Sequence, residues 1–158
     1  MEESIMVMEK ARPHLESLSQ LASQLNKATD LYMSELKEIE EQLNRLKLGV
    51  FVELNDWIQT DHRFPDPFAV DGQEPIGVSY RAWTIGYGKH NHDWCILLSE
   101  YKVSKNNDHD PILRSTAPLL DASRDLRLSA AEKIPDLLKE IEKEVRHKIE
   151  TVAKVSDR

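Results

Sequence analysis

The sequence is poor in glycine and proline, with five and seven of these among its 158 residues. Tracts rich in such residues are typical of flexible, low-complexity chains, so this sequence leaves no room for one. Hydrophobic residues make up 40% of the chain and charged residues 31%, a balance that is typical of a folded globular protein. A chain of this length predicts a single domain over residues 1–158.

Cysteine and long apolar runs are scarce too. Cys95 is the single cysteine, so no internal disulfide can form, and a lone thiol fits a reducing compartment. The apolar run at residues 5–8 is far shorter than the ~20 residues of a membrane span. The acidic start of the sequence lacks the positive region of a signal peptide. We therefore expect a cytoplasmic protein with no membrane partner and with a packed, structural thiol at Cys95.

An excess of positive charge is also missing. The chain holds 28 acidic and 21 basic residues, for a net charge of −7. A basic footprint is the usual signature of nucleic-acid binding. The composition therefore counts against nucleic acid, or an anionic membrane surface, as the main partner.

The N-terminal third carries the strongest pattern in the sequence. Its apolar residues recur at alternating spacings of three and four, the a and d positions of a coiled-coil heptad. These residues are Leu15, Leu18, Ala22, Leu25, Leu36, Ile39, Leu43 and Leu46, and the pattern extends back to Met8 and Ala11. A residue before proline is biased away from helix, so the pattern predicts that Pro13 starts the helix and that residues 1–11 form a separate or frayed turn. We expect residues 1–48 to be coiled-coil-like.

We call this line of a and d residues the seam. Its apolar character is interrupted at Thr29 and Tyr32, where either one helix continues or an αα-hairpin forms. We favour one helix because neither glycine nor proline marks a turn there, and Gly49 then ends it. Such a helix over residues 13–47 spans ~52 Å, whereas a strand of seven residues spans ~23 Å. The overhanging part must meet the C-terminal helix, a second subunit or a partner protein.

Residues 49–120 read as an antiparallel sheet of three to four strands. We expect strands at 50–54 (or on to 58), 76–88 and 94–103, with a further edge strand at 112–113 or 119–120. Gly86 and Gly88 leave a bare spot on one strand face, where the protein's own helix or a ligand could approach, and we favour the helix. On the opposite face, Arg81, Trp83, Ile85 and Tyr87 form either core or a recognition surface, and we favour core.

The C-terminal segment, residues 121–158, reads as helical with a kink or a fresh start at Pro135. Its apolar stripe consists of Leu138, Ile141, Val145, Ile149 and Val152. Together these segments predict the α+β class, with the order α-β-β-β-α.

Two histidine clusters invite a metal hypothesis. The first, at residues 90–93, reads better as a hairpin tip in which asparagine and aspartate make the turn. The second joins the loops at residues 60–75 and 104–111, which lie at one end of a three-stranded meander. Its weak candidate ligands are Asp61, His62, Asp108, His109 and Asp110, a mixed set that suits zinc or a similar ion.

No phosphate-binding glycine loop and no activated nucleophile is evident, so the sequence predicts no cofactor and favours a protein that is not an enzyme. The pattern indicates a protein–protein interaction or oligomerisation module that pairs with itself, as a homodimer or higher oligomer, or with another protein. The predicted interface is Leu15, Leu18, Leu25, Leu36, Ile39 and Leu43. The alternative is a metal-binding protein or metal-dependent enzyme that uses the His62 and His109 loops.

Overall fold

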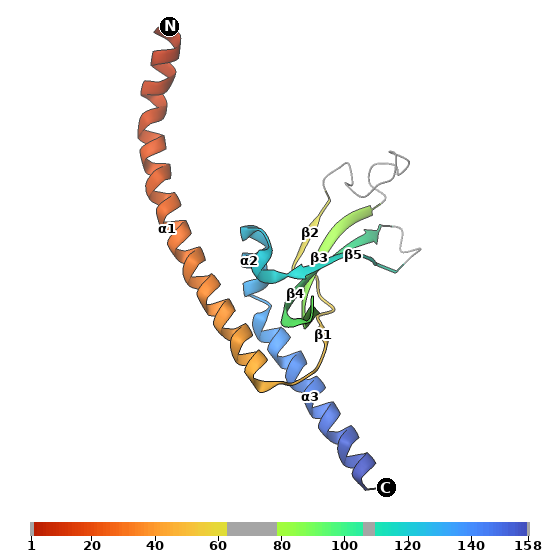
Figure 1. Cartoon of the computed structure of the whole chain (residues 1–158). Helices are drawn as coiled ribbons and strands as arrows, with labels where there is room; N and C mark the ends of the chain where they lie inside the picture. Colours follow the sequence, from red (N-terminus) through yellow and green to blue (C-terminus); the bar gives the residue numbers. More distant parts are fainter. Residues whose placement is uncertain (1, 63–78, 106–109, 158) are drawn as a thin grey trace. The chain divides into compact units, whose positions relative to one another are not determined.

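The computed structural model describes residues 2–62, 79–105 and 110–157, with side chains described from residue 5 onward. It confirms the α+β class: a long N-terminal helix, an antiparallel sheet and a C-terminal helix (Figure 1). The elements are α1 (Glu2–Leu46), β1 (Val52–Glu53), β2 (Gln59–Asp61), β3 (Ser79–His90), β4 (Asp93–Ser104), β5 (Ile112–Pro118), η1 (Leu119–Asp121), α2 (Arg124–Ala131) and α3 (Ile134–Ser156). Contacts divide the chain into two compact units, residues 1–39 and 40–158. The prediction of one domain stays a prediction.

The helix α1 is continuous, which confirms one helix rather than a hairpin. In its weak middle the Thr29 hydroxyl donates to the Leu25 carbonyl at 2.8 Å, which satisfies the hydroxyl within the helix. The prediction that Pro13 starts the helix was wrong, because α1 begins at Glu2 and runs through Pro13. Residues 2–11 are rich in glutamate, methionine, lysine and alanine, whose helix propensity favours continuation across the proline.

The end of α1 differs slightly from expectation. The helix ends at Leu46, and Lys47 is the first residue with a positive φ, at 50°. Gly49 follows with φ 65°. Two left-handed residues therefore turn the chain toward β1, although the sequence pointed to the glycine alone.

The sheet is antiparallel, with the strand order β1-β3-β4-β5. The first predicted strand is confirmed only as the two-residue strand β1, and β2, which follows the predicted bounds, was not predicted; both pair with the same edge of β3. Between them the backbone amides of Leu54 and Ile58 still donate to β3, at 2.9 and 2.8 Å. The Thr84 hydroxyl lies 3.0 and 2.9 Å from the carbonyls of Leu54 and Asp56. The edge strand predicted at residues 112–113 is confirmed as β5, and residues 119–120 lie in η1 instead.

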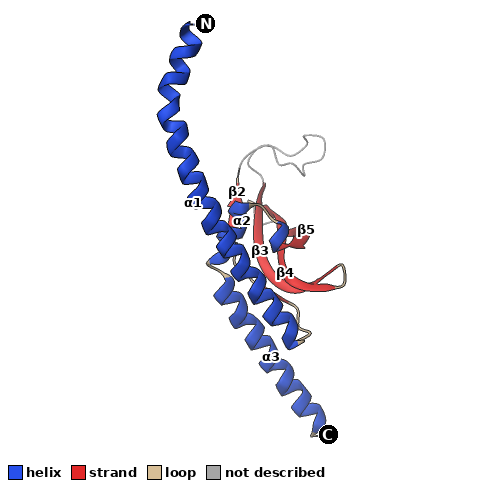
Figure 2. Ribbon diagram, turned by 60° about the vertical axis from the view of Figure 1, so that its left-hand side comes forward, coloured by secondary structure: helices blue, strands red, loops and turns tan. Residues whose placement is uncertain are grey.

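One face of the central hairpin, β3 and β4, forms the core. Trp83, Ile85 and Tyr87 are buried there, beside Ile96 and Leu98 across the ladder. The helix α3 contacts β1 and β3 and lies along this sheet (Figure 2). The interpretation of these β3 residues as core is therefore confirmed.

The opposite face carries the two glycines. A Cβ at Gly86 would collide with the Val52 carbonyl, and one at Gly88 would lie 2.6 Å from Cδ2 of Phe51. The expectation that a helix approaches here was wrong: the chain's own segment around β1 covers the bare spot. A short strand fits where the thicker helix, which carries side chains all round, would not.

The C-terminal segment is helical as predicted over Arg124–Ala131 and Ile134–Ser156, and Pro135 marks a fresh start. The helix α2 ends at Ala131, and α3 begins at Ile134 with Pro135 in its first turn. Ser123 caps α2 by accepting a hydrogen bond from the Leu126 amide at 3.4 Å. The core of the C-terminal unit includes Leu137 and Ile141 of α3.

Candidate interaction site

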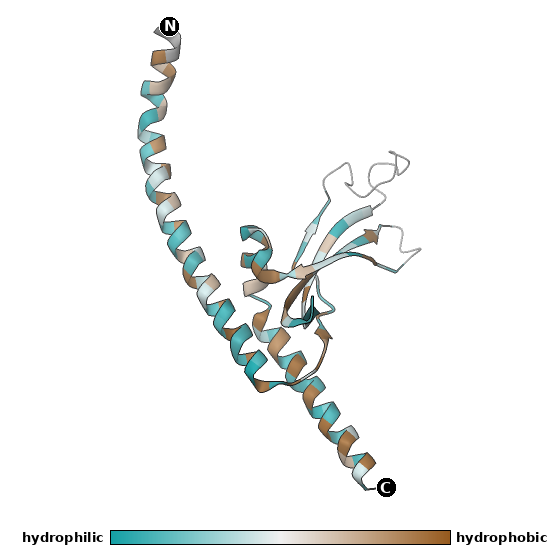
Figure 3. Cartoon of the chain, in the orientation of Figure 1, coloured by the Kyte–Doolittle hydropathy of each residue, from teal (hydrophilic) through white to brown (hydrophobic). Residues whose placement is uncertain are grey.

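The exposed part of the α1 seam is the clearest candidate site. We define the N-terminal stripe as its a and d residues from Met8 onward: Met8, Ala11, Leu15, Leu18, Ala22 and Leu25. Its four large side chains keep 46–58% of their surface exposed. Segments coloured as hydrophobic recur along this part of the helix in Figure 3. Exposed apolar surface that is continuous along one face is a mark of an interaction site, whereas scattered apolar residues are not.

The stripe is wider than a plain a/d seam. Val7 and Leu21 stand at g positions, next to the seam, and are 66% and 55% exposed. Ile5 at an e position is exposed as well. Apolar residues at e and g broaden the face that a helix offers to its neighbours.

The rest of the predicted interface has a different environment. Leu36 and Leu43 are buried and Ile39 is partly buried. Leu15, Leu18 and Leu25 are exposed. The surface that a partner could contact therefore comes from the N-terminal stripe.

A second apolar segment lies on α3. The predicted α3 stripe is buried at Ile141, but Ile149, Val152 and Val155 are 64–67% exposed. Lys148 donates to the Gly49 carbonyl at 3.2 Å, near the place where burial along α3 ends. The last turns of this helix thus add a smaller exposed apolar patch.

A depression of 660 Å³ lies between the end of α1 and the β3–β4 hairpin. Its lining consists of Glu40, Asn44, His90, Asn91, His92, Asp93, Trp94, Cys95, Pro118, Leu120 and Asp121. Glu40 accepts a hydrogen bond from the Ile96 amide at 2.9 Å. Burial raises the pKa of Glu40, and the nearby carboxylates of Glu41 and Asp121 raise it further, while the Ile96 bond lowers it. The depression is acidic and unsuited to phosphate.

The thiol of Cys95 borders this depression and is buried. Burial is the main cause that raises the pKa of Cys95 to about 11, and the neighbouring negative charge of Glu40 is the second. Because the thiolate is the reactive form, this shift disfavours nucleophilic chemistry at Cys95. The interpretation of Cys95 as a packed structural residue is confirmed.

The His90–Asp93 tip is a tight turn, as predicted. His90 pairs with Asp93, which leaves Asn91 and His92 as a two-residue loop. Both loop residues have positive φ, at 49° and 74°. A two-residue turn with positive φ at both positions has the form of a type I′ turn, in which asparagine is favoured.

The second histidine cluster falls partly outside the described residues. Asp61 lies opposite Arg81, which lies opposite Lys102, so both loops leave from one end of the sheet. His62 stacks on Tyr80 with ring centroids 4.3 Å apart. The candidates Asp108 and His109 lie outside the described residues. Among residues 2–62, 79–105 and 110–157, no three His, Cys, Asp or Glu side chains are grouped so as to hold a metal.

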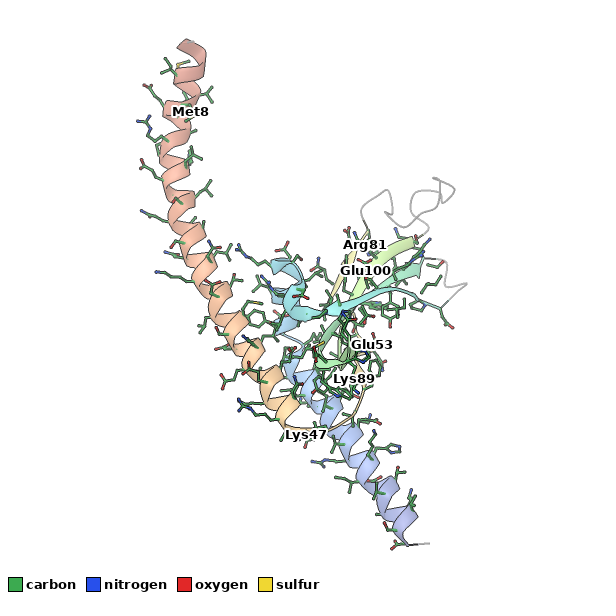
Figure 4. The ribbon with its side chains drawn as sticks, viewed as in Figure 1. Met8, Lys47, Glu53, Arg81, Lys89 and Glu100 are labelled. Atoms are coloured by element: carbon green, nitrogen blue, oxygen red, sulfur yellow. The ribbon has the colours of Figure 1, made fainter. Side chains whose placement is uncertain are left out.

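One partly buried ion pair was not foreseen. Arg81 donates to Glu100 through Nη2 and Nε at 2.5 and 3.2 Å, and its guanidinium lies 4.9 Å from the Trp83 ring centre (Figure 4). Glu100 is only 6% exposed. A buried carboxylate needs such a partner. In the sequence, this pair is signalled only by an acidic residue, Glu100, close after the apolar run 94–98. That signal does not identify Arg81 as the partner.

Comparison of the chain with protein-family models, curated proteins and solved structures finds no match. Within the part of the chain that the structure describes, no helix combines the length and apolarity that a membrane crossing requires.

Proposed function

We propose that this protein is a non-enzymatic interaction module that self-associates through α1. The observation that supports this proposal is the N-terminal stripe, in which four large apolar side chains at heptad positions remain about half exposed. A cytoplasmic location fits this role and stays a prediction.

The physical reason lies in the cost of leaving this stripe in water. Burying the exposed half of a leucine or methionine side chain contributes about 1 kcal/mol. Four such residues on each of two helices, with Val7 and Leu21 beside them, give association a driving force. Pairing with a second copy removes this area from water.

The test is the mass of the full chain in solution, measured by light scattering, for Leu18→Glu and its matched control Gln20→Glu. Both variants add one negative charge to the same helix, but Leu18 lies in the stripe and Gln20 at the outward f position. We expect wild type and Gln20→Glu to be dimeric or larger, and Leu18→Glu to be monomeric with unchanged circular dichroism. A monomeric wild type at tens of micromolar would refute the proposal.

The metal-dependent alternative can be tested separately. Thermal unfolding of the full chain with zinc, manganese and nickel, together with elemental analysis, checks the loops that contain His62 and His109. Stabilisation by one ion that is lost in His62→Ala would support this alternative. No stabilisation by any ion, in a protein that is purified without metal, would remove it.

A further inference from the structure

We propose that α1 pairs with α1 of a second copy in an antiparallel orientation, with the two-fold axis passing between Glu16 and Ser17. This inference rests on the proposed self-association and specifies its geometry. The exposed stripe runs from Met8 to Leu25, so its midpoint lies between these two residues. A two-fold axis at the midpoint lets the whole stripe contact its own copy.

The sizes of the stripe residues suit this pairing. Met8 would face Leu25 of the second copy, Ala11 would face Ala22, and Leu15 would face Leu18. Large residues meet large ones and alanine meets alanine, so one two-fold axis satisfies every layer. Beyond Leu25 the next seam residue is Thr29, which is buried and bonded to the Leu25 carbonyl. The contact is thereby limited to six layers.

Size alone also permits a parallel pair, in which each layer joins two identical residues. Parallel two-stranded coils favour β-branched residues at a and leucine at d. The a positions of the stripe are Met8, Leu15 and Ala22, and none is β-branched. The stripe thus lacks the pattern that selects a parallel dimer.

Charge favours the antiparallel orientation as well. The e and g positions along this segment are Ile5, Val7, Arg12, His14, Ser19, Leu21, Asn26 and Ala28. Among these eight residues, Arg12 is the only one of the types Asp, Glu, Lys and Arg. In a parallel coil it would lie beside Val7 of the second copy. In the antiparallel pair, e positions face each other, so Arg12 lies next to Ser19 and within one turn of Glu16 of the second copy. Two symmetric Arg12–Glu16 pairs form, and the helix dipoles oppose each other.

Cysteine cross-linking of full-length protein distinguishes the orientations. Met8→Cys and Leu25→Cys are prepared separately, mixed, refolded together and oxidised. We expect a disulfide-linked Met8→Cys/Leu25→Cys pair in the mixture and no linked dimer from either variant alone. At equal amounts the linked pair should reach about half of all dimers. Wild type, whose buried Cys95 has its pKa raised to about 11, is the background control.

Each alternative outcome overturns a distinct statement. Linked dimers of Met8→Cys with itself would show a parallel pair, which refutes the orientation while self-association stands. A dimer by light scattering that gives no cross-link in the mixture would also refute this geometry. A monomer would refute the proposed function itself. If either variant fails to fold by circular dichroism, Ala11→Cys with Ala22→Cys repeats the test at the next layer.

Discussion

The Tyr87 hydroxyl donates a hydrogen bond to the side-chain carbonyl of Asn44 at 2.6 Å. The amide nitrogen of the same Asn44 donates to the backbone carbonyl of Trp94 at 2.9 Å. Asn44 lies in the last turns of α1, whereas Tyr87 belongs to β3 and Trp94 to β4. One short side chain thus attaches the end of α1 to both strands of the central hairpin, and Glu40 adds its bond to Ile96 one turn earlier.

Replacing Tyr87 with phenylalanine should destabilise the C-terminal unit by about 1 kcal/mol. The variant keeps the buried ring and leaves the Asn44 carbonyl without its donor. Urea unfolding of wild type, Tyr87→Phe, Asn44→Ala and the double variant measures the coupling between the two residues. Strictly additive changes would show that this hydrogen bond contributes nothing.

Gly86→Ala should cost more stability than Gly49→Ala. An added Cβ at position 86 meets the Val52 carbonyl, which is backbone and cannot move aside without breaking β1 pairing. We expect a loss of about 3 kcal/mol. At Gly49 nothing lies within 4 Å, and the cost is only the strain of φ 65°, about 1 kcal/mol. Urea unfolding compares the two, and equal losses would contradict the close approach of β1.

The elements predicted well are those encoded by local repetition. The seam from Leu15 to Leu46 set the helix, and the alternation around Trp83 and Tyr87 set the buried face of β3. Such periods depend on neighbours in the sequence, so no knowledge of distant contacts is needed. The error at Pro13 is of the same kind: a local bias before proline was treated as a stop, although it is outweighed by the helix formers around it.

The parts that failed or were missed depend on contacts between distant segments. The backbone between β1 and β2 has hydrogen-bond partners in β3, among them the Thr84 hydroxyl, which lies about thirty residues further along the chain. The backbone that packs against Gly86 belongs to Val52, and the ion-pair partner of Glu100 is Arg81. In the candidate site, the sequence predicted the exposed leucines but not that Leu36 and Leu43 are buried, because both halves of the seam have the same spacing.

Glu40→Gln should stabilise the protein at neutral pH. Burial raises the pKa of Glu40 above the usual 4.5, so between 4.5 and the raised value the folded state binds more protons than the unfolded state. Stability therefore falls as pH rises through this window. Glutamine carries no charge and still accepts from the Ile96 amide. In urea unfolding from pH 4 to 7, the free energy of unfolding of Glu40→Gln should exceed that of wild type near pH 7 but not near pH 4. The exposed Glu140→Gln is the control, and an equal gain there would contradict this explanation.

His92→Gly should stabilise the hairpin by about 0.5–1 kcal/mol. His92 adopts φ 74°, which costs an L-residue energy that glycine does not pay. The resulting Asn-Gly pair also has the preferred sequence for a type I′ turn. His90→Gly is the matched control. His90 is the last residue of β3, so glycine at this position should lower the stability of the hairpin. Thermal unfolding measures both, and a lower midpoint for His92→Gly would contradict the turn assignment.

Charge reversal at Arg12 tests the proposed antiparallel pair independently of cross-linking. In that pair Arg12→Glu would bring two acids together at each of the two symmetric positions, so the dimer should dissociate several-fold more readily at low salt. The double variant Arg12→Glu/Glu16→Arg reverses both charges and should restore wild-type association. Lys10→Glu makes the same change of charge at the outward c position and serves as the control. Because surface ion pairs are screened, the difference between Arg12→Glu and wild type should shrink in 0.5 M salt, as measured by sedimentation equilibrium. An equal effect of Lys10→Glu, or no rescue by the double variant, would assign the change to net charge rather than to a contact between Arg12 and Glu16.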